Sequence, residues 1–240
     1  MTNDGSVMTR AEDALPTQQR ITDAALTLFA AKGFAATGIR EIADAVGITT
    51  ASLYHYMGTK EDLLVHIMTE GLTRFASAAR LAVSDLADPA RQLVAMVRVH
   101  VATEATQRRM SLVIDNEIRA LTKPADVVHL RDAYEDLWRQ SISAGVEAGA
   151  FHVADPALAR LALLEMCNGV AQWFRPGGAL TLAEVCDRFS DMSLSLIQAR
   201  DRDPVEPVSV ASLEMRSAEH EIAVVRNAYA SFCSPELGVG

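Results

Sequence analysis

The chain has 240 residues, of which 50% are hydrophobic and 22% charged, and its formal net charge is −9. That balance suits a globular protein and excludes a broadly basic coat for nucleic acid, so any nucleic-acid contact has to be local. The N-terminus lacks an apolar core segment, and no apolar run approaches the ~18 residues of a membrane span, which predicts a cytoplasmic protein without a membrane partner. The three cysteines have no metal-ligand spacing, which predicts reduced thiols and no metal site.

Apolar residues recur at helical spacing along most of the chain, and no alternating run is long enough to support a sheet. The predicted fold class is therefore all-α. In chain order, helices are expected over 18–32, 37–46, 50–57 and 59–80, from 88 onwards, and over 109–121, 124–148, 156–174 and 181–200. Their start signals are Thr37 as a cap, the Thr59–Asp62 and Thr181–Glu184 capping boxes, and the Asp88-Pro89 and Asp155-Pro156 pairs.

The pattern of small, glycine and apolar residues over 39–57 is typical of a helix-turn-helix. Ala43 is small where two helices cross, and Gly47 follows where the chain needs a left-handed turn. Ile48 and Leu53 are apolar where the turn and the second helix cover the core. An arbitrary helical hairpin is the alternative, because the Ala-x-x-x-Gly spacing alone is common.

The expected helix at 50–57 has few apolar side chains that could be buried in a core. Leu53 and Met57 share one face, and Thr49 is its expected N-cap. The outward residues are Thr50, Ala51, Ser52, Tyr54, His55 and Tyr56. Hydroxyls, phenols and an imidazole give short, directional hydrogen bonds to phosphates and base edges, and a helix N-terminus favours phosphate. Because the formal charges between residues 37 and 60 sum to zero, binding has to rest on these bonds, with Arg40 and Lys60 at the rim.

The stretch "RITDAALTLFAAKGFAATGIREIADAVGITTASLYHYMGTKEDLL", from Arg20 to Leu64, resembles the TetR family of transcriptional regulators. One departure is Tyr56-Met57, where the family usually has His-Phe. The resemblance implies that Thr37, Thr49, Tyr54 and Lys60 hold phosphates, that Thr50, Ala51, Ser52 and His55 face bases, and that Tyr56 does either. It also implies a homodimer on a palindromic double-stranded DNA operator, usually as a repressor, that releases DNA when a small hydrophobic ligand enters the C-terminal domain.

By that resemblance the chain divides into four parts. A flexible arm covers 1–16, the helix-turn-helix DNA-binding domain 17–63, and a helical ligand-binding and dimerisation domain 64–200. A linker and an extra C-terminal helix cover 201–240. In this extension Ala218, Ile222, Val225, Tyr229 and Phe232 form a further apolar stripe, so the extra helix is expected to dock on its own dimer.

Two helices of the C-terminal half, 156–174 and 181–200, resemble the pair that forms a four-helix bundle across the TetR dimer. The expected interface residues are Leu158, Leu161, Leu182, Val185, Phe189, Met192 and Leu196. Burial of the same stripe within one subunit is the alternative.

An effector pocket is expected beside these helices, with a few polar groups in an apolar wall. The candidate residues are Asn116, Trp138, Glu165, Asn168, Gln172, Trp173 and Phe174. A solvated polar strip is the alternative for Glu165, Asn168 and Gln172. "WFRPGGALTLAEV" resembles a segment of TetR regulators of fatty-acid and sterol catabolism, several of which respond to acyl-CoA thioesters. Arg119, Arg131 and Arg139 are candidate contacts for a CoA phosphate, although lone helical arginines usually face solvent.

Two other functions are weighed against a ligand-responsive regulator. An enzyme is disfavoured because the six histidines form no H-x-x-x-H pair and no glycine-rich phosphate loop occurs, and no cofactor is expected. An interaction protein that kept the fold but lost sequence-specific DNA binding is favoured mildly by the acidic charge and opposed by the intact segment from Thr49 to Lys60.

Overall fold

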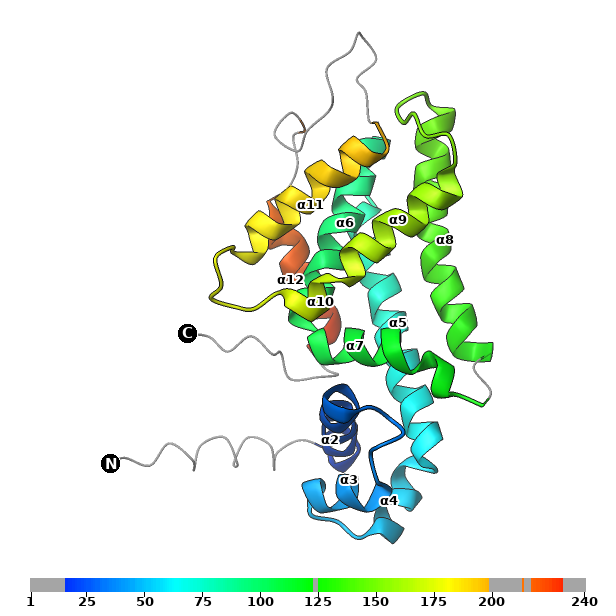
Figure 1. Ribbon diagram of the computed structural model, residues 1–240, viewed down its shortest axis with the longest axis vertical. Helices are drawn as coiled ribbons and strands as arrows, with labels where there is room; N and C mark the ends of the chain where they lie inside the picture. The colour runs from blue at the N-terminus through cyan, green and yellow to red at the C-terminus, as the bar shows by residue number, and fades with distance from the viewer. Residues whose placement is uncertain (1–15, 123–124, 199–212, 214–216, 231–240) are drawn as a thin grey trace, which may run out of the picture.

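The computed structural model describes residues 16–122, 125–198, 213 and 217–230. The expected arm at 1–15, most of the linker, Phe232 and Cys233 lie outside this part of the chain. All regular structure among the described residues is helical, so the all-α prediction is confirmed (Figure 1). None of these described helices is both long and apolar enough to cross a membrane.

From α2 to α11 the helices follow one another with short connections, whereas α12 begins only at Ala218 (Figure 1). They are α2 (Thr17–Lys32), α3 (Ile39–Val46), α4 (Thr50–Met57), α5 (Lys60–Val83), α6 (Pro89–Thr106), α7 (Arg108–Glu117), the 3-10 turn η1 (Ile118–Ala120), α8 (Ala125–Glu147), α9 (Pro156–Asn168), α10 (Val170–Trp173), α11 (Leu182–Leu196) and α12 (Ala218–Tyr229).

Most of the predicted start signals are confirmed, with one correction. The Thr59 and Thr181 capping boxes form, and Asp88 caps α6 with proline at the first helical position. The cap of α3 is Gly38 rather than Thr37, because Glu41 reaches back to the Gly38 N–H at 3.3 Å. The expected helix 156–174 is also divided into α9 and α10 at Gly169, and glycine is a poor helix former.

The helices α2, α3 and α4 form a small unit at the foot of the molecule in Figure 1. Its core contains Ile21, Phe29, Ile42 and Leu53, all with at most 1% of their surface exposed. Gly47 has φ 75° and ψ 34°, the left-handed conformation predicted for the turn, and it lets α4 cross α3 directly.

Above this unit, α5 rises into a bundle that surrounds α6. Each residue from Leu93 to Gln107 is buried, because α5, α8, α9, α11 and α12 all contact α6. One close approach depends on glycine: a β-carbon at Gly145 of α8 would lie 2.1 Å from the ring of Phe151, which is itself buried.

The small unit and the bundle share α7. Its residue Arg109 donates from Nη1 to Thr27 Oγ1 of α2 at 2.6 Å. Glu117, at its other end, accepts from the Phe34 N–H at 3.1 Å. The face of α7 that turns away from α2 packs on α5 and α10.

Within the expected C-terminal extension, the structure has the helix α12, which packs on its own subunit. Tyr229 donates from its hydroxyl to the Gly71 carbonyl at 2.9 Å, and Arg74 donates from Nη1 to the Ala228 carbonyl at 2.7 Å. Ala218 and Val225 are buried with Tyr229, as the stripe predicted, against α5 and α6.

Candidate DNA-reading helix and effector cavity

The helix α4 is anchored by two side chains, and its remaining side chains face outward or lie half-buried. Thr49 accepts the Ser52 N–H at 3.1 Å as the predicted N-cap, and the two hydroxyls lie 2.9 Å apart. Leu53 and Met57 are the buried pair. Tyr54 and Tyr56 are each 49% exposed. Ala51 and His55 are exposed as well, whereas Thr50 and Ser52 are half-buried at the front of the helix.

Two residues that were expected to bind phosphates use their side chains in hydrogen bonds to the protein's own backbone. Thr37 is 2% exposed, and its hydroxyl donates to the Gly33 carbonyl at 2.8 Å, so its side chain is not available to DNA and instead fixes the turn before α3. The Lys60 ammonium donates to the Phe34 and Thr37 carbonyls, each at 2.8 Å, and lies 4.2 Å from the centre of the Phe34 ring. Arg40 remains exposed on α3.

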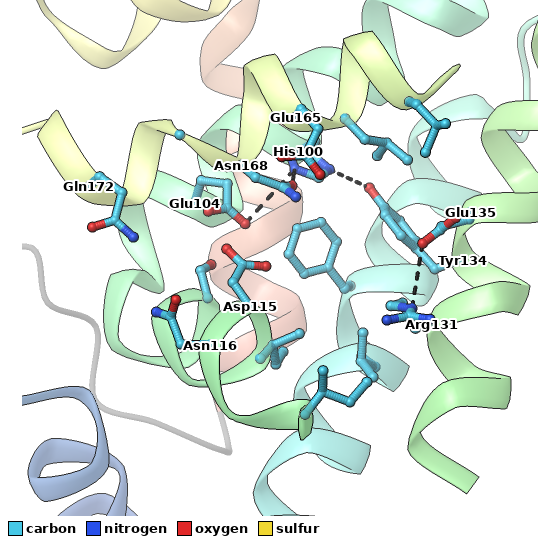
Figure 2. Close-up of a pocket in the computed structure, with 18 of the residues that line it drawn as sticks. His100, Glu104, Asp115, Asn116, Arg131, Tyr134, Glu135, Glu165, Asn168 and Gln172 are labelled. Atoms are coloured by element: carbon cyan, nitrogen blue, oxygen red, sulfur yellow. Dashed lines mark hydrogen bonds and ion pairs between the residues drawn. The ribbon is translucent and has the colours of Figure 1, made fainter. Parts of the chain in front are cut away.

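A cavity of about 520 Å³ lies among α5, α6, α7, α8 and α9 (Figure 2). Four predicted effector residues line it: Asn116, Glu165, Asn168 and Gln172. Glu165 and Gln172 are also exposed and Asn168 is half-buried, so the solvated-strip alternative stays open beside the effector role. Arg119 and Arg131 also line the cavity, whereas Arg139 pairs with Asp136 outside it.

The aromatic wall was predicted wrongly, because spacing along a helix does not tell which way each ring points. Trp138 is fully buried and packs edge-on to His100, with 5.6 Å between ring centres, but it does not line the cavity. Trp173 lies half exposed beside Phe189, and Phe174 is buried next to Trp173. Leu72, Phe75 and Tyr134 contribute to the apolar wall in their place.

The polar lining of the cavity includes residues that the sequence argument missed. Chief among them are His100 and Glu104, one turn apart on the otherwise apolar α6, and this spacing is the signal that could have found them. His100 Nδ1 lies 2.8 Å from the Tyr134 hydroxyl, and Nε2 lies 2.8 Å from Asn168 Oδ1. Both ring nitrogens are therefore engaged (Figure 2).

Burial decides the charge of this histidine. It lowers the pKa of His100 to about 4, so the ring is neutral at physiological pH. Its Nε2 then donates to Asn168, and its Nδ1 accepts from Tyr134. The 3.9 Å approach of His100 Nε2 to Glu104 Oε1 is consequently not an ion pair.

Three carboxyl groups gather beside this histidine: Glu104 on α6, Asp115 on α7 and Glu165 on α9 (Figure 2). Burial, and then the nearby Asp115 charge, raise the pKa of Glu104 well above its usual range. Burial, and then Glu165, raise the pKa of Asp115 to about 7. Both shifts favour the protonated acid, and Asp115, with a pKa of about 7, is close to half ionised at neutral pH.

The cavity rim carries positive charge. Arg131 of α8 approaches Glu135, which also binds Arg160 of α9. Arg119 lines the cavity from η1 and is exposed. The rim is thus partly cationic beside the exposed Asp115 and Glu165, whereas Glu104 is the buried member of the acidic cluster.

The expected dimer residues divide into outward and inward groups. Leu158 is 63% exposed on α9, and Leu161, Met192 and Leu196 are exposed as well. Leu182 and Phe189 are half-buried. Val185 corrects the prediction, because it is 1% exposed and packs inside its own subunit, where no second copy reaches it. Leu161 also lines the cavity, so the outward face and the cavity share a side chain.

A helix-turn-helix unit joined to a helical bundle with an internal cavity defines a ligand-responsive DNA-binding regulator. Residues 21–67 match the family described as bacterial regulatory proteins, tetR family, and residues 86–197 match the family described as tetracyclin repressor-like, C-terminal domain. The chain belongs to the TetR family, and it is a ligand-responsive transcriptional repressor rather than an enzyme. The helix α12 lies beyond both matched regions.

Individual relatives agree with this assignment. The chain is 31% identical over 177 residues to the HTH-type transcriptional repressor KstR2 of Rhodococcus jostii (strain RHA1), covering 72% of this chain and 86% of the repressor. The structure of AibR in complex with isovaleryl coenzyme A and operator DNA is 29% identical with a TM-score of 0.68, covering 74% of this chain and 97% of AibR. A tetR-family regulatory protein from Rhodococcus RHA1 is 30% identical with a TM-score of 0.72, covering 78% of this chain and all of that protein.

Proposed function

We propose that the chain is a homodimeric repressor that reads a palindromic operator with α4 and leaves it when an acyl-CoA thioester enters the cavity. The observation that carries the DNA-reading part is the outward polar face of α4, a short helix held down only by Leu53 and Met57. A capped helix N-terminus with small residues fits into a major groove and favours a phosphate beside it.

The contacts divide into two kinds by the reach and position of the side chains. Thr50, Ala51, Ser52 and His55 lie at the front of α4 and along its outward face, where base edges would be met. Thr49, Tyr54 and Arg40 flank this face and suit phosphates, and Tyr56 suits either. Lys60 acts chiefly by fixing α4 and α5 to the preceding turn, since its ammonium already binds two carbonyls.

Substitutions on α4 test this division. Tyr54→Ala is expected to weaken binding to all duplexes alike, because a phosphate contact carries no sequence information. Ser52→Ala or His55→Ala is expected to relax preference at particular base pairs, by about 1–3 kcal/mol for a lost base contact. Selection from a random duplex library followed by affinity measurement reads out both effects.

Ser77→Ala, an exposed serine on α5 far along the chain from α4, is the matched control and should change neither measurement. A change of sequence preference alone in Tyr54→Ala would contradict its phosphate role. A library that stays unenriched with the unaltered protein would instead favour an interaction protein without sequence-specific DNA binding.

The outward leucines and methionine of α9 and α11 support the dimer. Exposed apolar side chains along two neighbouring helices suit a four-helix bundle with a second copy. A dimeric helix-turn-helix protein places its reading helices about 34–36 Å apart, one turn of DNA. A second copy therefore sets the spacing at which two half-sites are bound together.

A charge placed on this face should separate the copies. Met192→Glu is expected to shift the protein to monomer at micromolar concentration, because a carboxylate would be desolvated at the interface without a partner. Sedimentation equilibrium measures the association directly. Leu81→Glu is the matched control, since Leu81 is 59% exposed on α5, away from α9 and α11. A dimer of unchanged affinity in Met192→Glu would place the interface elsewhere.

An acyl-CoA is the effector class that the relatives favour, since AibR was crystallised with isovaleryl coenzyme A and operator DNA. The cavity volume suits an acyl group with part of the pantetheine arm, and Arg119 and Arg131 lie where CoA phosphates would approach the rim. Native mass spectrometry of the freshly purified protein would identify a retained ligand. Failure of isovaleryl-CoA and longer acyl-CoAs to bind or to release the selected operator would overturn this effector class.

A further inference from the structure

Two polar atoms in the cavity lining make no hydrogen bond of standard geometry, although the Ser111 hydroxyl lies close enough to the Glu104 carboxyl to lower its pKa. They are Oε2 of Glu104 and Oγ of Ser111, from α6 and α7, and both side chains are 2% exposed. A buried donor or acceptor without a partner is costly, so such atoms are uncommon in folded proteins. Two of them in the wall of one cavity indicate that a polar group of the ligand completes the arrangement.

The neighbouring polar groups do not provide hydrogen-bond partners for these two atoms. His100 uses both ring nitrogens on Tyr134 and Asn168, and it is neutral. Asp115 and Glu165 are acidic, like Glu104, and neither has an ion pair among the described residues. Burial of Glu104, and then the nearby Asp115 charge, raise its pKa and so favour its protonated form.

We propose that the Glu104 carboxyl and the Ser111 hydroxyl together donate hydrogen bonds to the carbonyl oxygen of the effector's thioester. The inference rests on the acyl-CoA proposal above and assigns the atom of the ligand that the cavity recognises. The acyl chain then lies against Leu72, Phe75 and Ile114, and the CoA moiety extends toward Arg119. Glu104 and Ser111 supply two hydrogen-bond donors to one oxygen. A purely hydrocarbon ligand has no acceptor and would leave both donors unpaired.

The acidic surroundings make this recognition sensitive to pH. The titratable and charged groups around Glu104 are His100 on its own helix, Asp115 on α7, Glu165 and Cys167 on α9, and Arg119 on η1, with Arg131, Tyr134 and Glu135 on α8. When Asp115 ionises, its carboxylate repels the carbonyl oxygen of the thioester and the anionic CoA. Affinity is therefore expected to fall as the pH rises through about 7, the pKa of Asp115.

A pair of probes that differ in one oxygen tests the inference. Isovaleryl-CoA carries the thioester carbonyl, and S-isopentyl-CoA is the thioether of equal chain length without it. Titration calorimetry of the full-length dimer should show the thioether binding at least about tenfold more weakly at pH 6.5, as expected for two lost hydrogen bonds to buried donors. Asp115→Asn should leave the thioester's affinity nearly constant between pH 6 and pH 8.

Variants separate recognition from general structure. Glu104→Gln keeps a donor and should retain the preference for the thioester, whereas Glu104→Met and Ser111→Ala should each reduce it. Ser190→Ala is the matched control, because Ser190 is a buried serine that donates to the Cys186 carbonyl away from the cavity. Thermal melting of each variant verifies that it is folded.

The possible failures are distinguishable. Equal affinity for the two probes overturns the carbonyl inference and leaves the acyl-CoA proposal standing. Binding of neither probe overturns the acyl-CoA proposal and this inference with it. Thioester affinity that rises with pH also overturns the inference, because it would mean that the carboxylate forms, rather than the acid, favour the ligand.

Discussion

Removing α12 by ending the chain at residue 212 is expected to lower the melting temperature by roughly 10 °C or more. The deletion exposes the faces of α5 and α6 that α12 covers, and it removes the buried side chains of Val224, Val225 and Tyr229 from the core. Burying three such side chains contributes on the order of 5 kcal/mol. Differential scanning calorimetry of the truncated and full-length proteins measures the difference.

Tyr229→Phe is the matched control for this deletion. It keeps the aromatic ring and removes only the hydroxyl that donates to the Gly71 carbonyl, so it should cost about 1 kcal/mol. Equal melting temperatures for the truncated and full-length proteins would contradict the docking of α12, independently of the melting temperature of Tyr229→Phe.

Asp115→Asn is expected to stabilise the protein at pH 8 and to change its stability little at pH 4. The pKa of Asp115 is raised from 3.8 to about 7 in the folded state by burial and by Glu165. The folded protein thus holds a proton that the unfolded chain has lost, and stability falls as the pH rises from about 4 to about 7. Above pH 7 the full cost applies, reduced by solvent screening because Asp115 is exposed, and asparagine does not incur it.

His100 has the opposite effect on stability in part of the same range. Its pKa is lowered from 6.5 to about 4, so its contribution is complete above pH 6.5 and is lost as the pH falls toward 4. In the unaltered protein the slopes from His100 and Asp115 oppose each other between pH 4 and pH 6.5. Glu104, whose pKa is also raised, opposes the His100 slope as Asp115 does, so in Asp115→Asn the fall of stability with rising pH should become less steep.

Urea unfolding of both proteins at several pH values between 4 and 8 measures these slopes. Asp136→Asn serves as the control, because Asp136 is exposed, and the hydrogen bond from Arg139 lowers its pKa, so neutralising it should bring no gain at pH 8. A stability difference for Asp115→Asn that is the same at pH 4 and pH 8 would contradict the raised pKa of this carboxyl.

The DNA-reading unit was the part of the molecule most open to prediction from sequence. Its determinants are local: Gly47 needs a left-handed turn, Thr49 caps α4, and Leu53 and Met57 lie one turn apart on the helix. Thr37 was placed wrongly because the sequence also allows it to cap α3. The reach of Glu41 to the Gly38 N–H, together with the nearby Gly33 carbonyl, decided the outcome.

The cavity was only half predictable, because its lining depends on how five helices turn about their axes. The polar row of Glu165, Asn168 and Gln172 was visible as a helical face, and it does line the cavity. The direction of the Trp138 ring and the convergence of Glu104 with Asp115 are tertiary facts, since these residues lie on different helices. Val185 belongs to the same class, because an apolar stripe can face its own core or a second copy.

The position of α7 has a mechanical consequence for regulation. Ser111, Asp115 and Asn116 of this ten-residue helix form a wall of the cavity, while Arg109 and Glu117 hold the small N-terminal unit. A ligand that displaces this wall is expected to move α7 as a whole, because no flexible linker separates the wall from the N-terminal unit. The helix α2, which Arg109 contacts, would then tilt with α7. In a homodimer, the same tilt in both copies would change the distance between the two α4 helices, so that they no longer match the helical repeat of the DNA.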